Sequence, residues 1–182
     1  MVKLGHINYL NCLPVHGAIL LGKIPFDGEI IEGPPSYLNK LLDEGILDVS
    51  PSSSFEIIKG HKIIPNFSIS SKQEVKSIIL ITKNDLTMMK KGVFFITAHS
   101  QTSSMLIKLI LKEFIPLKAD YLVFTPENEK TEELLKKADG ILYIGDYALK
   151  NFDFPNTLKY DLAKIWYDYT KLPFTFALWQ VS

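Results

Sequence analysis

Short apolar runs alternate with polar turns through the first fifty residues. Residues 2–7 form an apolar run typical of a buried strand, and the runs 28–31 and 46–50 repeat this pattern. Between them, residues 15–22 and 37–43 place apolar side chains at helical spacing. Alternation of strands and helices within so short a stretch is typical of a parallel sheet in an α/β domain.

The same alternation begins again after the polar segment 83–91. Apolar strands are predicted at 92–97, 121–125 and 141–144, and helices at 105–114 and 131–137. Because strands and helices again follow one another, we expect a second α/β unit.

The last apolar run, residues 172–179, is predicted to be a buried strand whose partner is the first sheet. The chain is therefore expected to leave a first lobe, build a second lobe and return. We place the first lobe at residues 1–82 plus 164–182 and the second at residues 83–163.

Composition and charge exclude several classes of function. The chain of 182 residues is 47% apolar, and its 20 basic residues, all lysine, balance 20 acidic ones. No polybasic patch indicates binding to nucleic acid or to an anionic membrane. No apolar run reaches the ~20 residues of a membrane span, and the N-terminus lacks the pattern of a signal peptide. We therefore expect a cytoplasmic protein, whose oligomeric state the sequence does not indicate.

The turn after the first strand carries two amide side chains, Asn8 and Asn11. Ligands of α/β proteins meet the carboxyl ends of the strands, and the start of the following helix offers free backbone N–H groups. These two residues are therefore candidates for ligand binding. The alternative is that they only cap the helix and close the turn, which asparagine often does.

Other polar groups fall at predicted strand ends. They are Ser52, Ser53 and Ser54, then Ser100, Thr102 and Ser103, and finally Gly145 and Asp146. Ser77 lies within the predicted strand 75–82. Hydroxyl groups, amides and free N–H groups can bind carboxylates in a chain without arginine. The alternative for each group is a structural helix cap.

The histidines and the cysteine give weaker signals. His6 could act as a general base, but a histidine at a strand end is more often structural. No pair of histidines has metal-ligand spacing, and the single cysteine, Cys12, permits no internal disulfide. We interpret Cys12 as a packed thiol, although a nucleophile is the alternative. No phosphate-binding or dinucleotide-binding glycine motif occurs, so neither a metal nor a cofactor is expected.

Four motifs resemble the chorismate dehydratase family of the futalosine route to menaquinone. They are Gly5-His6-Ile7-Asn8-Tyr9-Leu10-Asn11-Cys12-Leu13-Pro14, Leu47-Asp48-Val49-Ser50-Pro51-Ser52-Ser53-Ser54-Phe55-Glu56, Ile144-Gly145-Asp146-Tyr147-Ala148-Leu149 and Leu172-Pro173-Phe174-Thr175-Phe176-Ala177-Leu178-Trp179. The resemblance covers nearly the whole chain in order. It implies a two-lobed α/β fold of the type II periplasmic-binding-protein class, with the ligand in the cleft between the lobes.

The resemblance also implies a reaction. Members of the family remove water from chorismate, a small dicarboxylate, to give 3-[(1-carboxyvinyl)oxy]benzoate. Carried over by motif, Asn11 and Ser77 are expected at the reacting centre, where a substrate carboxylate could serve as the base. The substrate-binding residues are expected to be Asn8, Ser53, Ser100, Thr102, Ser103 and Asp146.

Two features depart from the family, and two alternatives stay open. The family usually continues beyond the Phe176-Ala177-Leu178-Trp179 strand, and His99 and Gln101 stand where smaller or basic residues are expected. One alternative is a 1,4-dihydroxy-6-naphthoate synthase of the same pathway. The other is a binding protein for a small carboxylate that catalyses nothing.

Overall fold

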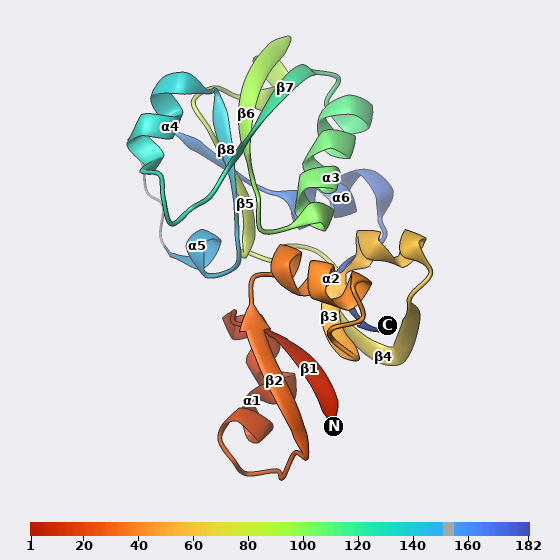
Figure 1. Cartoon of the computed structure of the whole chain (residues 1–182). Coiled ribbons are helices and arrows are strands. Elements are labelled where there is room, and N and C mark those ends of the chain that lie inside the picture. The colour runs from red at the N-terminus through yellow and green to blue at the C-terminus, as the bar shows by residue number, and fades with distance from the viewer. Residues whose placement is uncertain (151–154) are drawn as a thin grey trace. The chain divides into compact units, whose positions relative to one another are not determined.

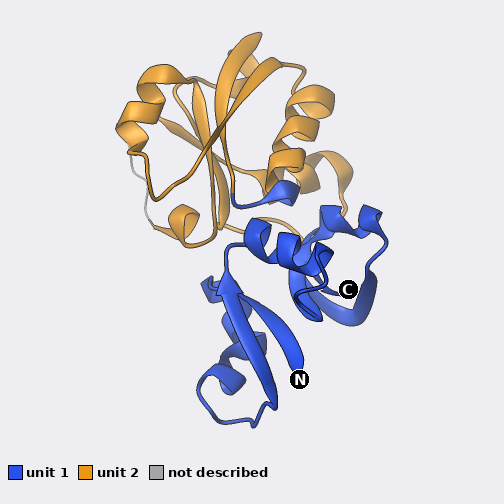
Figure 2. Cartoon of the chain, in the orientation of Figure 1, with its two compact units in different colours: residues 1–70, 99–102, 175–182 blue, residues 71–98, 103–174 orange. Residues whose placement is uncertain are grey.

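The computed structural model describes residues 1–150 and 155–182, and the chain divides into two compact units (Figure 2). Unit 1 comprises Met1–Ser70, His99–Thr102 and Thr175–Ser182. Unit 2 comprises Ser71–Ala98 and Ser103–Phe174. This division differs from the expected one, because the strand that ends at Thr82 and the helix from 162 to 170 both belong to unit 2.

Unit 1 is built on a five-stranded sheet in the order β2-β1-β3-β10-β4 (Figure 1). Its strands are β1 (Val2–Ile7), β2 (Gly28–Gly33), β3 (Val49–Ser53), β4 (Lys62–Ser71) and β10 (Phe174–Val181). β1 is parallel to both β2 and β3, as the alternating pattern predicts. β10 pairs antiparallel with β3, so the prediction that the last apolar strand joins the first sheet is confirmed.

Two α-helices and two 3₁₀ turns connect the strands of unit 1. They are η1 (Leu10–Cys12), α1 (Leu13–Leu20), α2 (Pro35–Asp43) and η2 (Ser54–Lys59). α2 buries Leu38 and Leu42 at i, i+4 spacing against a core that includes Ile7, Cys12 and Leu47. This core anchors the end of β1 at Ile7 and the end of η1 at Cys12, so the turn between Ile7 and Cys12 rests on packed side chains.

Unit 2 has its own five-stranded sheet, in the order β7-β6-β8-β5-β9. The strands are β5 (Ile78–Thr82), β6 (Lys91–Thr97), β7 (Lys118–Phe124), β8 (Gly140–Ile144) and β9 (Leu158–Asp161). β6 is parallel to β7 and β8, whereas β5 is antiparallel to β8 and β9. β9 is a short edge strand, and the polar sequence Lys159-Tyr160-Asp161 lacks the apolar pattern that would have predicted it.

The helical elements of unit 2 are η3 (Leu86–Met88), α3 (Gln101–Leu109), the π-helix η4 (Ile110–Phe114), α4 (Thr131–Lys137), α5 (Gly145–Leu149) and α6 (Leu162–Thr170). Among them, α4 has the predicted bounds, whereas α3 starts earlier than the sequence predicts. α3 begins four residues before the expected Met105, so Thr102 and Ser103 lie in its first turn instead of a loop. Within residues 1–150 and 155–182, no helix is long and apolar enough to cross a membrane.

Candidate active site

The turn that carries Asn8 and Asn11 joins β1 to α1 and includes η1. The amide N–H of Cys12 donates to the carbonyl oxygen of Tyr9 at 3.0 Å and closes the turn. Tyr9 and Cys12 occupy the N-cap positions of η1 and α1, and neither helix has a side-chain cap hydrogen bond. The capping alternative for the two asparagines is therefore wrong. Both are exposed, so their amide groups are available to a ligand.

The segment 99–102 lies beside this turn in unit 1. The hydroxyl oxygen of Tyr9 is 3.3 Å from Nδ1 of His99. The carbonyl oxygen of His99 accepts from the backbone N–H of Ser36 at 3.1 Å, near the start of α2. Pro34 is the N-cap residue of α2 and makes no side-chain hydrogen bond there. The backbone N–H of Ser36, in the first turn of α2, has no partner within the helix. The carbonyl oxygen of His99, which is far away in the sequence, accepts its hydrogen bond instead.

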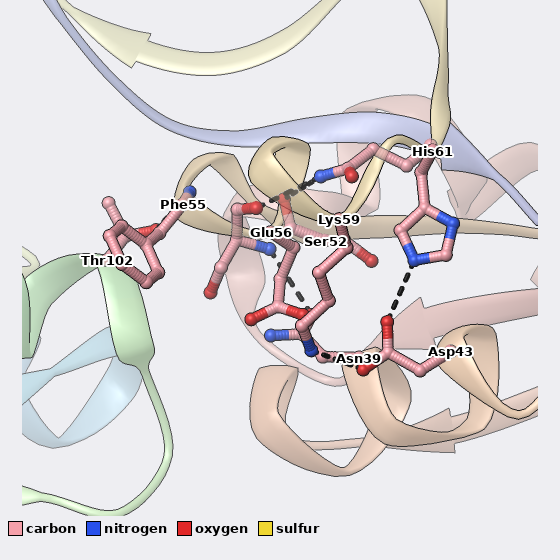
Figure 3. Close-up of polar contacts among 10 residues, drawn as sticks. Asn39, Asp43, Ser52, Phe55, Glu56, Lys59, His61 and Thr102 are labelled. Carbon is pink, nitrogen blue, oxygen red and sulfur yellow. Dashed lines mark hydrogen bonds and ion pairs between the residues drawn. The ribbon is translucent and has the colours of Figure 1, made fainter.

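The serine cluster 52–54 also reaches the segment 99–102 (Figure 3). Oγ of Ser54 lies 3.4 Å from Oγ1 of Thr102, and the backbone N–H of Phe55 donates to the same oxygen at 3.4 Å. Ser52 and Ser53 were expected after the strand but lie within β3, where they are 0% and 2% exposed. Unit 1 therefore gathers three of the predicted polar clusters: the asparagine turn, the serines and the segment with Ser100 and Thr102.

Two buried amide side chains hold the serine strand in place. Oδ1 of Asn39, on α2, accepts from the backbone N–H of Ser53 at 3.3 Å. Nε2 of Gln180, on β10, donates to the carbonyl oxygens of Ser52 and Ser53 at 3.4 and 3.0 Å. Sequence reasoning missed both residues. For Gln180 the sequence did hold a signal, because this residue directly follows the apolar run 172–179. An amide that is buried with such a strand needs hydrogen-bond partners.

A chain of charged residues follows the serines along η2 and α2 (Figure 3). The ammonium of Lys59 pairs with the carboxylates of Glu56 and Asp43, and Oδ1 of Asp43 lies 2.8 Å from Nε2 of His61. Glu56 is only 1% exposed. Hydrogen bonds to Asp43 and to Glu56 raise the pKa of Lys59, so it stays charged between the two acids. Sequence reasoning missed this network too, because its members are spread over α2, η2 and the segment that follows η2.

In unit 2 the structure brings Ser77 and the Gly145-Asp146 turn together. Ser77 lies just before β5 and is 7% exposed. The backbone N–H of Gly145 donates to the carbonyl oxygen of Ser77 at 2.8 Å, beside the paired residues Ile78 and Ile144. Gly145 has φ of 55°, a conformation that favours glycine. Ser103, the remaining predicted residue of this unit, is 2% exposed on α3.

The thiol of Cys12 follows Asn11 directly and is 0% exposed. Burial raises its pKa to about 12, against a smaller lowering by a hydrogen bond with the backbone of Ile7. A thiol with such a pKa carries almost no thiolate at neutral pH, so the structure disfavours the nucleophile alternative.

One hollow of unit 2 has none of the predicted site residues in its lining. It has a volume of about 400 Å³ in unit 2 and is lined by Lys108, Leu111, Lys112, Pro116, Leu117, Ala119 and Tyr121. Its two lysines belong to α3 and η4. Across the described part of the chain, no group of three or more His, Cys, Asp or Glu residues could hold a metal ion.

Two α/β units, each with a mixed five-stranded sheet, define a protein of the type II periplasmic-binding-protein-like class. Solved structures share this fold. An Archaeoglobus fulgidus protein superposes with a TM-score of 0.78 at 14% identity, over 99% of this chain and 67% of its own. The periplasmic aliphatic sulphonate binding protein of Escherichia coli gives 0.67 at 14% identity, over 99% of this chain and 60% of its own.

The sequence comparisons narrow the class to one family. Residues 2–182 match the family described as menaquinone biosynthesis, and the chain belongs to that family. It is 31% identical to a chorismate dehydratase of Thermus thermophilus, over 97% of this chain and 68% of the relative. A chorismate dehydratase of Campylobacter jejuni is 29% identical, over 95% of this chain and 64% of the relative. The chain therefore spans about two thirds of the length of these relatives.

Proposed function

We propose that this chain acts as a chorismate dehydratase in the futalosine route to menaquinone. The observation that carries the proposal is its membership of the menaquinone biosynthesis family, with two curated chorismate dehydratases as relatives. The substrate is a dicarboxylate with a hydroxyl group on a ring that is not yet aromatic. Loss of a ring proton and the neighbouring hydroxyl forms a carbon–carbon double bond and releases one water.

Formation of the aromatic ring drives the reaction. The protein therefore mainly has to bind the dicarboxylate, orient the bonds that break and exclude water. Hydroxyl groups and backbone N–H groups of unit 1 suit the binding of carboxylates in a chain that has no arginine. For this role we propose Ser53, Ser100 and Thr102, together with Ser103 of unit 2. The hydrogen bonds that hold Ser54 and Phe55 to Thr102 support this assignment, because they keep two of the clusters together.

At the reacting centre we propose Asn11 and Ser77. The exposed amide of Asn11 can donate to the departing hydroxyl group, and the hydroxyl of Ser77 can orient a carboxylate or assist the proton. Neither group is a strong base, so a carboxylate of the substrate is the proposed base. Asn8 and Asp146 complete the proposed set of binding residues.

The first experiment incubates the purified chain with chorismate and measures loss of one water by mass spectrometry. An aromatic product that is absent without protein supports the proposal. Tight binding of chorismate without product would point to a protein that binds a small carboxylate. Neither binding nor product would overturn the substrate assignment, and the later intermediates of the route, including those of 1,4-dihydroxy-6-naphthoate synthase, would then be tested.

Variants test the residue assignment separately from the reaction. Asn11→Ala and Ser77→Ala should each lower kcat by roughly 100-fold or more, as expected for groups that act in the transition state. Asn128→Ala removes an exposed amide from a turn of unit 2 and serves as the matched control, which should keep full activity. Full activity in both Asn11→Ala and Ser77→Ala would overturn the site while leaving the reaction intact.

A further inference from the structure

Three buried side chains of unit 1 form a hydrogen-bonded chain next to the Asn8–Asn11 turn. Nδ1 of His6 lies 3.0 Å from Nδ1 of His16, and Nε1 of Trp179 donates to Nε2 of His16 at 3.1 Å. The three side chains are 3%, 2% and 4% exposed, respectively. They come from β1, α1 and β10, so the chain joins the strand before the turn, the helix after it and the returning strand.

Only one arrangement of protons satisfies both hydrogen bonds. The indole N–H of Trp179 can only donate, so Nε2 of His16 must carry a lone pair. A neutral His16 then carries its proton on Nδ1 and donates to Nδ1 of His6. His6 is in turn neutral with its proton on Nε2. Burial, followed by the neighbouring His6, lowers the pKa of His16 to about 4, which agrees with this neutral state.

The turn itself has little local structure to hold it. η1 is only three residues long, and neither η1 nor α1 has a side-chain cap. The hydrogen bond between His6 and His16 spans the turn, because one histidine precedes Asn8 and the other follows Asn11 by five positions. Trp179 then fixes His16 to β10, with their rings edge-on at 5.6 Å between centroids.

We propose that His6, His16 and Trp179 are positioning residues, which hold the Asn8–Asn11 turn so that the amide of Asn11 meets the reacting hydroxyl of the substrate. This inference rests on the proposed function. Apolar side chains could fill the same space, whereas buried polar groups are costly unless they are paired. The directional bonds, and not only the volume of the three rings, therefore fix the geometry of the turn.

The test compares the two tryptophans of the chain. Trp179→Phe removes the donor to His16, while Trp166→Phe on α6 removes an indole N–H that has no hydrogen-bond partner among the described residues. Trp179→Phe should lower kcat roughly 10- to 100-fold, because small displacements of catalytic groups cost about this much. KM for chorismate should change less than twofold in the same variant. Trp166→Phe should leave kcat and KM within twofold.

A double-mutant cycle separates positioning from a general structural role. In the Asn11→Ala background, Trp179→Phe should lower kcat less than about twofold further, because the group that it positions is already gone. If Trp179→Phe lowers kcat by the same factor in the wild type and in the Asn11→Ala background, the proposal is overturned. His16→Phe should behave like Trp179→Phe, whereas His16→Gln, which keeps one acceptor and one donor, should recover most of the loss.

A measurement without substrate decides the inference even if the chain does not dehydrate chorismate. The amide of Cys12, which closes the turn, should exchange its hydrogen roughly tenfold faster in Trp179→Phe than in wild type, because local opening becomes easier. Trp166→Phe should leave this rate unchanged. Unchanged protection of Cys12 in Trp179→Phe would overturn the positioning role, while absent turnover in wild type would overturn only the proposed function.

Discussion

The hydroxyl oxygen of Tyr9 lies 3.3 Å from Nδ1 of His99, although 90 positions separate the two residues. Tyr9 stands between the two asparagines of the first turn, and His99 opens the segment with Ser100 and Thr102. The contact therefore joins the turn that carries Asn11 to the segment that carries Ser100 and Thr102, two of the residues proposed for carboxylate binding. It also gives a role to His99, which departs from the residue that the family motif leads one to expect.

Removing the hydroxyl group of Tyr9 should weaken substrate binding. Tyr9→Phe keeps the ring and loses the bond to His99, so the segment 99–102 is held less well. We expect KM for chorismate to rise about fivefold, since a hydrogen bond contributes about 1 kcal/mol, and kcat to fall less. Tyr169→Phe on α6 removes a hydroxyl group from a residue that is 55% exposed and should change neither constant. An unaltered KM in Tyr9→Phe would contradict the prediction.

Gly5 of β1 should not tolerate a side chain. A Cβ atom there would lie 2.3 Å from Oγ of Ser50 on β3. Gly5→Ala should therefore destabilise the chain by about 1–3 kcal/mol, as overpacking of a core does. Gly17→Ala, in the interior of α1, meets no atom closer than 3.9 Å and should stabilise it by up to about 1 kcal/mol. Thermal unfolding of both variants measures this difference in sign.

The thiol of Cys12 should be inert in the folded protein. Its pKa of about 12 and its complete burial leave almost no accessible thiolate at pH 7. A thiol reagent such as dithionitrobenzoate should react with the native chain only as fast as the chain opens. The same reagent should react within the mixing time in urea. Fast labelling of the native protein, with activity retained, would show that the side chain is more accessible than the structure indicates.

Stability should fall as the pH decreases from about 6.5 to about 4. An unfolded histidine binds a proton below about 6.5, whereas His16 in the folded chain does so only below about 4. Between these values the unfolded state holds more protons, so lowering the pH favours unfolding. The pKa of His6 is also lowered by burial, against an opposing effect of Glu32, and contributes in the same direction.

For His16, the free energy of unfolding should fall by about 3 kcal/mol as the pH decreases from about 6.5 to about 4. This figure follows from the difference of about two and a half between the pKa values of the unfolded and folded states. Denaturant midpoints at pH 4 and pH 7 measure it. The pKa of Asp43 is lowered because hydrogen bonds from Lys59 and His61 exceed the opposing effect of burial, so its contribution is lost only below pH 3.8. His16→Gln cannot titrate and should show a smaller difference between the two midpoints; an equal difference would refute the assignment to His16.

Lys59 should stabilise unit 1 through Glu56. Lys59→Met leaves the carboxylate of Glu56 buried without its cation. We expect a loss of about 1–3 kcal/mol, less than for a fully buried pair because Lys59 is partly exposed. Adding Glu56→Gln to the Lys59→Met variant should restore part of the lost stability. Lys40→Met removes an exposed lysine that lies 3.8 Å from Glu44, and it should leave the unfolding midpoint unchanged.

The local pattern of the sequence was sufficient for most elements of the fold. Apolar runs and helical spacing predict β1, α2, β6, α4 and β8 to within a few residues, because these segments pack one apolar face against a core. They also predict that the last strand returns to the first sheet. The edge strand β9 and the early start of α3 escaped this reasoning, since polar residues form those segments and long-range contacts hold them.

For the site, the chemical groups can be identified from the motifs alone, whereas the contacts that each group makes depend on the tertiary structure. The motifs carry the amides and hydroxyls, because those residue types are needed whatever surrounds them. Only folding brings Tyr9 to His99, Ser54 to Thr102 and Ser77 to Gly145. The tertiary structure also decided that Asn8 and Asn11 cap no helix, and that His6, His16 and Trp179 share their hydrogen bonds. Such contacts depend on strand order and burial, which no spacing along the chain encodes.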